Sequence, residues 1–392
     1  MTAAPIAFGP TLADLDARGL RRRRRTVRRG DDRMSADIEL DGRACVDFCS
    51  NDYLGLAAHP AVVKAFVDAA REHGVGARAS HLITGHMSEH EALERELAAH
   101  TGRERALVFS TGYMANLGLA SALVARGGAV FGDRLNHASL IDAGRMSRAT
   151  IHHYPHGDAA ALAGQLAARE SGLALVMTDG VFSMDGDLAP LPALARLCAD
   201  QAAFLAVDDA HGIGVVGATG RGSLEHFGLS ATEVPALVGT FGKAFGTFGA
   251  FVAGGGELIE TLIQRARTYI YTTALPPAVA AATRAALAVS VAESWRRERV
   301  LALTQRFRRL AAGAGLALAD SATPIQPILL GGAEAAVQAS QALLERGYFV
   351  AAIRPPTVPA ETSRLRVTLS AAHRDADVDG LVTALAEVLA AT

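Results

Sequence analysis

The chain has 392 residues, half of them hydrophobic and a fifth charged, with a formal net charge of −2. Its length exceeds one typical core, so two or more domains are expected, and its charge argues against binding nucleic acid. No apolar run predicts a membrane span or a secretory signal. The three cysteines match neither a disulfide framework nor a zinc motif, which favours a reducing cytoplasm. They are Cys45, Cys49 and Cys198.

The N-terminal segment predicts a helix, an arm and a hairpin. The helix is expected over 11–25, and its last five residues are the arginine run Arg21–Arg25, typical of a solvated helix face. Residues 38–48 alternate in polarity around Asp41-Gly42, a hairpin signal. Two further helices and a glycine-rich loop between them are expected next: 59–73, 89–100 and the loop 74–85.

Strands and helices then alternate, which predicts an α/β fold with a mostly parallel seven-stranded sheet and helices on both faces. The expected strands are 106–109, 129–131, 150–154, 173–177, 204–207, 237–240 and 250–253. The expected helices are 112–124, 137–145, 158–169, 191–200, 258–267 and one long helix over 276–312. A smaller α+β unit should follow, with strands 325–329, 349–353 and 364–369 and helices 333–346 and 377–389.

Several predicted strands end in polar or glycine residues. Because the carboxyl ends of parallel strands share one edge of a sheet, where ligands bind, these residues are the candidate site. They are Ser110-Thr111-Gly112, Asp133, Thr178-Asp179-Gly180, Asp208-Asp209-Ala210-His211 and Thr240-Phe241-Gly242-Lys243.

Lysine usage singles out Lys243. The chain has only two lysines, Lys64 and Lys243, and every other cationic position that is not histidine is arginine. Arginine can replace a lysine that supplies charge, but not an amine that must lose its proton and attack a carbonyl. Lys64 begins an amphipathic helix, whereas Lys243 lies between glycines and phenylalanines after an apolar run. A buried amine can form a Schiff base. The alternative is that the aliphatic part of the Lys243 side chain only covers the end of a strand.

Asp208, His211 and Lys243 end neighbouring predicted strands and suggest pyridoxal phosphate. This cofactor requires a lysine, a carboxylate at its ring nitrogen, and backbone amides at a helix N-terminus for its phosphate. Ser110–Tyr113 opens a helix after a strand and offers the last feature. The alternative is that Asp208 and His211 only cap a turn.

Two other patterns carry weaker predictions. Gly212–Gly217 matches the G-x-G-x-x-G of NAD-dependent dehydrogenases, an alternative from another class, but the following residues 218–223 are poor helix formers. His86 and His90 are spaced i, i+4 without an H-E-x-x-H motif, so we interpret them as ordinary polar positions rather than metal ligands. The same interpretation applies to the histidines at a strand exit: His152, His153 and His156.

Five segments make the chain resemble the α-oxoamine synthases, fold-type I pyridoxal phosphate enzymes that condense an amino acid with an acyl thioester and release carbon dioxide. The segments are Ser50–Leu56, Asp133–Ser139, Gly180–Asp187, Val207–Gly212 and Thr240–Lys243. Residues 353–359 look most like the biotin-pathway member, which joins L-alanine to a pimeloyl thioester of coenzyme A or acyl carrier protein. A sister enzyme that uses glycine and another acyl-CoA is the nearest alternative.

The resemblance implies roles for the strand-end residues. Lys243 would carry the cofactor and move protons, and Asp208 would pair with the ring nitrogen. His137 would stack on the ring and contact substrate. Ser183 and His211 would hydrogen-bond the phenolic oxygen of the ring.

The resemblance also implies a homodimer whose active site lies at the subunit interface. Gly112, Tyr113 and Thr240 would lie at the cofactor phosphate, and Thr273 would reach the phosphate bound by the partner subunit. One departure concerns the family's Ser-Arg-Leu, which reads Ser80-His81-Leu82 here.

Substrate contacts are implied for residues near both ends of the chain. Arg366 would hold the amino-acid carboxylate with Asn51 nearby, and Thr357 and Arg22 would also contact substrate. The expected domains are an N-terminal helix and arm over 1–55, a large cofactor-binding domain over 56–285 and a small C-terminal domain over 286–392.

Overall fold

The computed structural model describes residues 9–169 and 172–390. They form two compact units, one of Asn51–Val300 and one that joins the segment up to Ser50 to the segment from Leu301. The N- and C-terminal segments belong together because β3 (Arg43–Asp47) pairs in parallel with β12 (Tyr348–Phe349). These divisions fall after residues 50 and 300, whereas the sequence analysis put them after residues 55 and 285.

The Asn51–Val300 unit contains the predicted seven-stranded sheet, in the order β4-β10-β9-β8-β7-β5-β6. β10 runs antiparallel to β4 and β9, and the other strand pairs of the sheet are parallel, so the fold prediction is confirmed. The strands are β4 (Arg105–Phe109), β5 (Ala129–Asp133), β6 (Thr150–Tyr154), β7 (Ala174–Asp179), β8 (Phe204–Asp208), β9 (Ala236–Thr240) and β10 (Ala250–Gly254).

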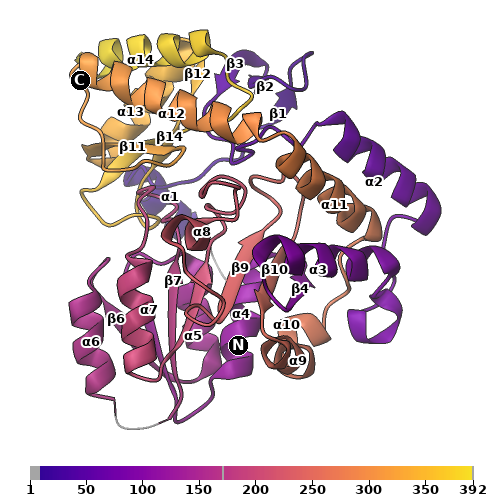
Figure 1. Cartoon of the computed structure of the whole chain (residues 1–392). Helices are drawn as coiled ribbons and strands as arrows, with labels where there is room; N and C mark the ends of the chain where they lie inside the picture. The colour runs from indigo at the N-terminus through magenta and orange to yellow at the C-terminus, as the bar shows by residue number, and fades with distance from the viewer. Residues whose placement is uncertain (1–8, 170–171, 391–392) are drawn as a thin grey trace, which may run out of the picture. The chain divides into compact units, whose positions relative to one another are not determined.

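Helices cover both faces of this sheet (Figure 1). On one face, alternate strand residues such as Leu107, Leu175 and Val252 pack in one core cluster with α4, α5 and α9. Residues that point to the other face, such as Val176 and Val207, are also fully buried. Strands buried on both faces need continuous apolar runs, which these segments have.

The helices of this unit follow the predicted order, with small shifts at their ends. They are α2 (Pro60–His73), the π-helix η1 (His81–Gly85), α3 (Ser88–Thr101), α4 (Gly112–Leu123), α5 (Ala138–Ser147), α6 (Ala159–Ala167), α7 (Leu191–Asp200), α8 (Ser223–Phe227), α9 (Gly256–Arg265), α10 (Arg267–Ile270) and α11 (Pro277–Ala292). Within the described ranges, no helix combines the length and apolarity needed to cross a membrane.

The long helix predicted over 276–312 is instead two helices, α11 and α12 (Trp295–Gly313). The chain leaves helical geometry at Glu293, where ψ is 57°. The Glu293 carboxylate accepts a hydrogen bond of 2.6 Å from Arg296 Nε, which fixes the start of the second helix.

The other unit holds two small sheets, ordered β1-β2-β3-β12 and β11-β14-β13. The predicted hairpin is present, and its two-residue turn has positive φ at Asp41 (50°) and Gly42 (85°), as a tight turn requires. The strand predicted over 349–353 splits between the two sheets. The remaining elements are β1 (Val27–Arg29), β2 (Asp37–Leu40), β11 (Ile325–Gly331), β13 (Ala351–Ile353), β14 (Ser363–Thr368), α13 (Ala333–Glu345) and α14 (Asp375–Ala390).

The prediction that the arginine run is helical is wrong. Helix α1 (Gly9–Ala17) ends before it, and Gly19 has a φ of 63°, the left-handed conformation that commonly ends helices. Arg21–Arg25 therefore form an irregular, exposed segment. Arg21 pairs with Asp16 at 2.5 Å and Arg25 lies 3.8 Å from Asp41.

Candidate functional site

The carboxyl edge of the seven-stranded sheet gathers the predicted catalytic side chains. Asp208 ends β8, and Lys243 follows the adjacent strand β9. His137 lies just before α5. Burial lowers the pKa of the His137 imidazole; the negative charge of Asp208 opposes this effect and the positive charge of Lys243 adds to it. The three side chains therefore lie within electrostatic range of one another.

Asp179, at the end of β7, supports this cluster. Its carboxylate accepts a hydrogen bond of 2.7 Å from the backbone N–H of His137, and its own N–H donates to Asn136 Oδ1 at 3.2 Å. Burial, with repulsion from Asp208, raises the pKa of the Asp179 carboxyl well above its usual range. Asp179 thus positions His137 through the backbone N–H of that residue.

Two residues of this cluster were missed by the sequence analysis. Asn116, on α4, donates from Nδ2 to Asp208 Oδ2 at 2.6 Å. Tyr53 Oη lies 2.6 Å from His211 Nδ1 and 3.4 Å from Asn51 Oδ1, so it links two predicted site residues. Tyr53 stands within Ser50–Leu56, one of the segments that carried the family resemblance, whereas the sequence around Asn116 holds no comparable signal.

The predicted phosphate-binding residues surround the start of α4 and the end of β9. The Thr111 side chain caps α4 by accepting a hydrogen bond from Met114 N at 3.1 Å, and Gly112 is the first helical residue. Thr240 Oγ1 donates to Gly249 O at 3.0 Å. A 12-residue helix presents a positive dipole end here, which suits an anion.

Three other predicted residues of the same unit lie in loops or at a helix start. Tyr113 is exposed and its hydroxyl donates to Asp142. Ser183 is half-buried in a turn that the Val181–Leu188 bridge closes. Thr273 is exposed between α10 and α11.

The other unit brings two predicted substrate residues together. Arg22 Nη2 donates to Thr357 Oγ1 at 3.0 Å, although 335 positions separate them in the sequence. Arg366, in β14, is 7 % exposed and donates from Nη1 to Thr368 Oγ1 at 3.0 Å.

His156 joins two of the site's loops instead of acting as an isolated polar residue. Its Nδ1 lies 3.1 Å from Asp133 Oδ1 and its Nε2 lies 2.9 Å from Asp187 Oδ2. Hydrogen bonds to these two carboxylates raise the pKa of His156 to about 10. The protonated ring therefore ties the loop that carries His137 to the loop that carries Ser183.

A histidine cluster elsewhere in this unit has a third member, His81, which the sequence analysis did not identify. The side chains of His81, His86 and His90 offer nitrogen atoms within 4.8 Å of one another. His90 Nδ1 accepts from Met87 N at 2.9 Å and its Nε2 lies 2.6 Å from Leu275 O. Both nitrogens of His90 are thus used by backbone groups, which leaves it no lone pair for a metal ion.

The Gly212–Gly217 segment lacks the helix that a dinucleotide site requires. It forms successive turns, with positive φ at Gly214 and Gly217. The next helix, α8, begins at Ser223, whose N–H and hydroxyl bind the buried Asp209 carboxylate. The dehydrogenase alternative therefore loses its structural support.

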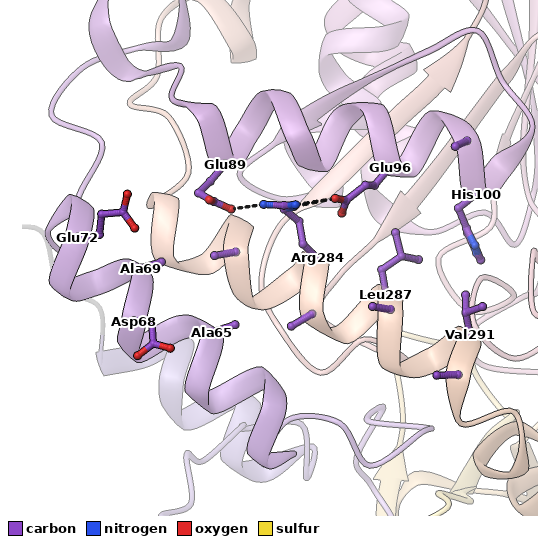
Figure 2. Close-up of a pocket in the computed structure, with 15 residues that line it drawn as sticks. Ala65, Asp68, Ala69, Glu72, Glu89, Glu96, His100, Arg284, Leu287 and Val291 are labelled. Carbon is purple, nitrogen blue, oxygen red and sulfur yellow. Dashed lines mark hydrogen bonds and ion pairs between the residues drawn. The ribbon is translucent and has the colours of Figure 1, made fainter.

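A separate hollow of about 860 Å³ is lined by α2, α3 and α11. Figure 2 shows Arg284 reaching between Glu89 and Glu96, with contacts of 2.8 and 2.7 Å. Its walls carry many alanines, and none of the predicted site residues lines it. Because Arg284 is already paired with both Glu89 and Glu96, we assign the hollow no ligand.

Comparison with known proteins agrees with the resemblance seen in the sequence. Residues 43–385 match the family model described as "Aminotransferase class I and II". The chain is 59 % identical to 8-amino-7-oxononanoate synthase of Methylococcus capsulatus over 386 residues, 98 % of this chain and 99 % of that protein. It is also 59 % identical to the enzyme of that name from Thioalkalivibrio sulfidiphilus, with 94 % of each chain covered.

Solved structures with the same fold include pyridoxal phosphate enzymes. A serine palmitoyltransferase from S. paucimobilis has a TM-score of 0.92 at 29 % identity, covering 97 % of this chain and 96 % of that chain. An 8-amino-7-oxononanoate synthase from Francisella tularensis has a TM-score of 0.77 at 30 % identity, covering 88 % of this chain and 98 % of that chain. The chain belongs to the aminotransferase class I and II family.

Proposed function

We propose that the protein is an 8-amino-7-oxononanoate synthase, which condenses L-alanine with a pimeloyl thioester and releases carbon dioxide and free thiol in biotin biosynthesis. The observation that carries this proposal is the convergence of Lys243, Asp208 and His137 at one edge of the sheet. The near-full-length similarity to enzymes of that name supports the choice among related reactions.

The residues at this edge fit pyridoxal phosphate, the cofactor named in related structures. Lys243 supplies the amine, Asp208 a buried carboxylate for a protonated pyridine nitrogen, and the start of α4 a site for phosphate. Ser183 and His211 supply donors for the phenolic oxygen, and Thr240 a hydroxyl for the phosphate. When bound, the cofactor stabilises the carbanion that forms at the amino-acid Cα.

The chain's own residues then bind substrate and move protons. Lys243 removes the Cα proton of alanine and later returns a proton to the product. Asp208 keeps its pyridine partner protonated, because a buried carboxylate requires a cationic partner. Arg366 and Asn51 hold the alanine carboxylate, and Arg22 and Thr357 contact the acyl substrate.

We further propose a cytoplasmic homodimer. The exposed Thr273 reaches the phosphate bound by the partner subunit, while Gly112 and Tyr113 bind the phosphate of their own subunit. Several apolar side chains are exposed, as expected of a surface that a partner subunit covers. They are Leu82, Ile83 and Tyr271.

A substrate panel tests the reaction. Thiol release is measured with alanine plus pimeloyl-CoA, alanine plus pimeloyl-acyl carrier protein, and glycine plus acetyl- or succinyl-CoA. We expect release with alanine and a pimeloyl thioester, and the faster of the two carriers identifies the donor. Preference for glycine and a short acyl chain would reassign the protein to a sister activity.

A spectrum tests the cofactor independently. Addition of pyridoxal phosphate to the purified protein should produce a visible absorbance band that borohydride abolishes and that Lys243→Arg does not form. Absence of the band would contradict the proposed cofactor chemistry.

A further inference from the structure

The side chain of Asn116 contacts Asp208 directly and is linked to His137 through Ser139. It projects from α4 and is completely buried. Its Nδ2 carries two hydrogens and has two acceptors, Asp208 Oδ2 at 2.6 Å and Ser139 Oγ at 2.9 Å. Turning the amide over would bring its oxygen against the Asp208 carboxylate, so the carboxylate fixes the amide orientation.

Asp208 uses its other oxygen for the backbone. Its Oδ1 accepts from Ala210 N at 3.1 Å, so a backbone amide and the Asn116 amide hold one oxygen each. A carboxylate has about four acceptor positions, so it retains capacity for a protonated ring nitrogen. Asn116 therefore restrains the carboxylate and leaves it acceptor positions for the ring nitrogen.

Ser139 transmits this arrangement to His137. Because Ser139 Oγ accepts from Asn116, its own hydrogen is free to point to His137 Nδ1, 2.8 Å away. The backbone N–H of Ser139 faces the same nitrogen at 3.3 Å. Two donors at Nδ1 require a lone pair there, so the His137 proton lies on Nε2.

The lowered pKa of His137 agrees with the neutral ring that the contacts at Nδ1 indicate. Burial is the main cause, and the charged groups that face the ring are Asp208, which opposes the shift, and Lys243, which adds to it. The Nδ1 lone pair is thus occupied and Nε2–H is the ring's remaining donor.

We propose that Asn116 is a positioning residue that holds the Asp208 carboxylate and, through the Ser139 hydroxyl, fixes His137 as the neutral imidazole protonated at Nε2. The inference rests on the proposed function, in which Asp208 and His137 face the cofactor. One amide then helps to set the orientation of both side chains, so loss of the Asn116 side chain should affect both. Within the described residues, Asn116 Oδ1 is buried without a hydrogen-bond partner in the protein, a cost that positioning of Asp208 explains.

The first test measures cofactor affinity by titration with pyridoxal phosphate. Asn116→Ala should weaken binding roughly 10- to 100-fold, because it removes one hydrogen bond to a charged group. Ser121→Ala is the matched control on the same helix, since its hydroxyl hydrogen-bonds the carbonyls of Leu117 and Gly118 in its own helix. Equal affinity of Asn116→Ala and the parent protein, or an equal loss in Ser121→Ala, would overturn the proposal.

The second test uses the protein without cofactor and reads the His137 tautomer by ¹⁵N NMR of histidine-labelled protein. The parent and the control Ser147→Ala, whose hydroxyl contacts Gly144 O, should show protonated Nε2. Asn116→Ala and Ser139→Ala should both show more of the Nδ1-protonated tautomer than the parent, because the 3.3 Å contact from the backbone N–H of residue 139 is then the one fixed donor that remains at Nδ1. An unchanged tautomer in both variants would contradict the relay through Ser139.

The two tests separate this inference from the proposed function. If the parent protein binds no pyridoxal phosphate, the proposed function fails, while the tautomer measurement still decides whether Asn116 and Ser139 control His137. Ser139→Ala removes only one hydroxyl, so it keeps the relay testable if Asn116→Ala does not fold.

Discussion

At the scale of single residues, the two lysines differ in surroundings rather than in chemistry. Lys64 is exposed on α2 and pairs with Asp68 at 2.5 Å. Lys243 is half-buried and lies within electrostatic range of His137, Asp179 and Asp209. Their surroundings therefore predict opposite responses to the same substitution.

Lys243→Arg should reduce condensation activity by roughly 10³-fold or more, because arginine keeps the charge but supplies no nucleophilic amine. Steady-state thiol release measures the loss. Lys64→Arg is the matched control and should retain parental activity, since its ion pair survives the change. Parental activity in Lys243→Arg would contradict the role of this lysine.

His156→Gln should destabilise the fold at neutral pH by about 1–2 kcal/mol, an amount limited by solvent screening of a partly exposed ring. The folded-state pKa of about 10 lies above the ordinary histidine value of 6.5. The stabilisation is therefore fully present below pH 6.5 and disappears as pH rises through 10.

Urea unfolding of His156→Gln and the parent protein at several pH values measures this difference. His153→Gln, in β6 three residues before His156, is the control and should match the parent throughout. A gap between His156→Gln and the parent that widens with rising pH would contradict a protonated His156.

At the scale of elements, the lysine loop after β9 is held by a close backbone approach. Gly246 has a φ of 65°, its N–H donates to Lys243 O at 2.9 Å, and a Cβ here would lie 2.3 Å from Ala57 N. The neighbouring atoms are backbone, so they cannot turn aside as a side chain could. Gly246 is therefore required to keep Lys243 in position.

Gly246→Ala should cost about 2–4 kcal/mol in stability and lower cofactor affinity, because both the positive φ and the contact become strained. Thermal unfolding with and without pyridoxal phosphate measures both effects. Gly164→Ala, in α6 with no atom within 4 Å of the new Cβ, should be neutral or slightly stabilising. Equal stability of both variants would contradict the packing argument.

The arrangement of helices and strands also explains which site residues the sequence could predict. Asp208 and Lys243 could be identified because Asp208 ends one apolar strand and Lys243 closely follows another, and parallel strands bring such ends together. Asn116 could not, since its contact with Asp208 spans 92 positions and depends on how α4 packs. The helix prediction for the arginine run failed because one left-handed glycine, Gly19, outweighed a run of good helix formers.

At the scale of the whole molecule, the proposed homodimer gives Thr273 a role in the partner subunit's site. The alternative is that Thr273 serves its own subunit or no site at all. Because a twofold dimer has two equivalent sites, mixed dimers of two inactive variants separate these cases.

Thr273→Ala and Lys243→Arg should each lower activity below about a tenth of the parent. When equal amounts are mixed as subunits, about a quarter of the parental activity should return, since each mixed dimer has one site with both lesions and one intact site. Co-expression with two affinity tags isolates the mixed dimers, which should show about half of the parental activity in the thiol-release assay. No recovery above the separate variants would contradict a contribution across the interface.

The most direct test of the account follows the carboxyl carbon of alanine. Protein loaded with pyridoxal phosphate is incubated with pimeloyl-CoA and L-alanine labelled with ¹³C at the carboxyl group. Labelled carbon dioxide, free thiol and 8-amino-7-oxononanoate should appear in equal amounts and be absent with Lys243→Arg. Thiol release without labelled carbon dioxide, or the same products from Lys243→Arg, would contradict decarboxylating condensation at Lys243.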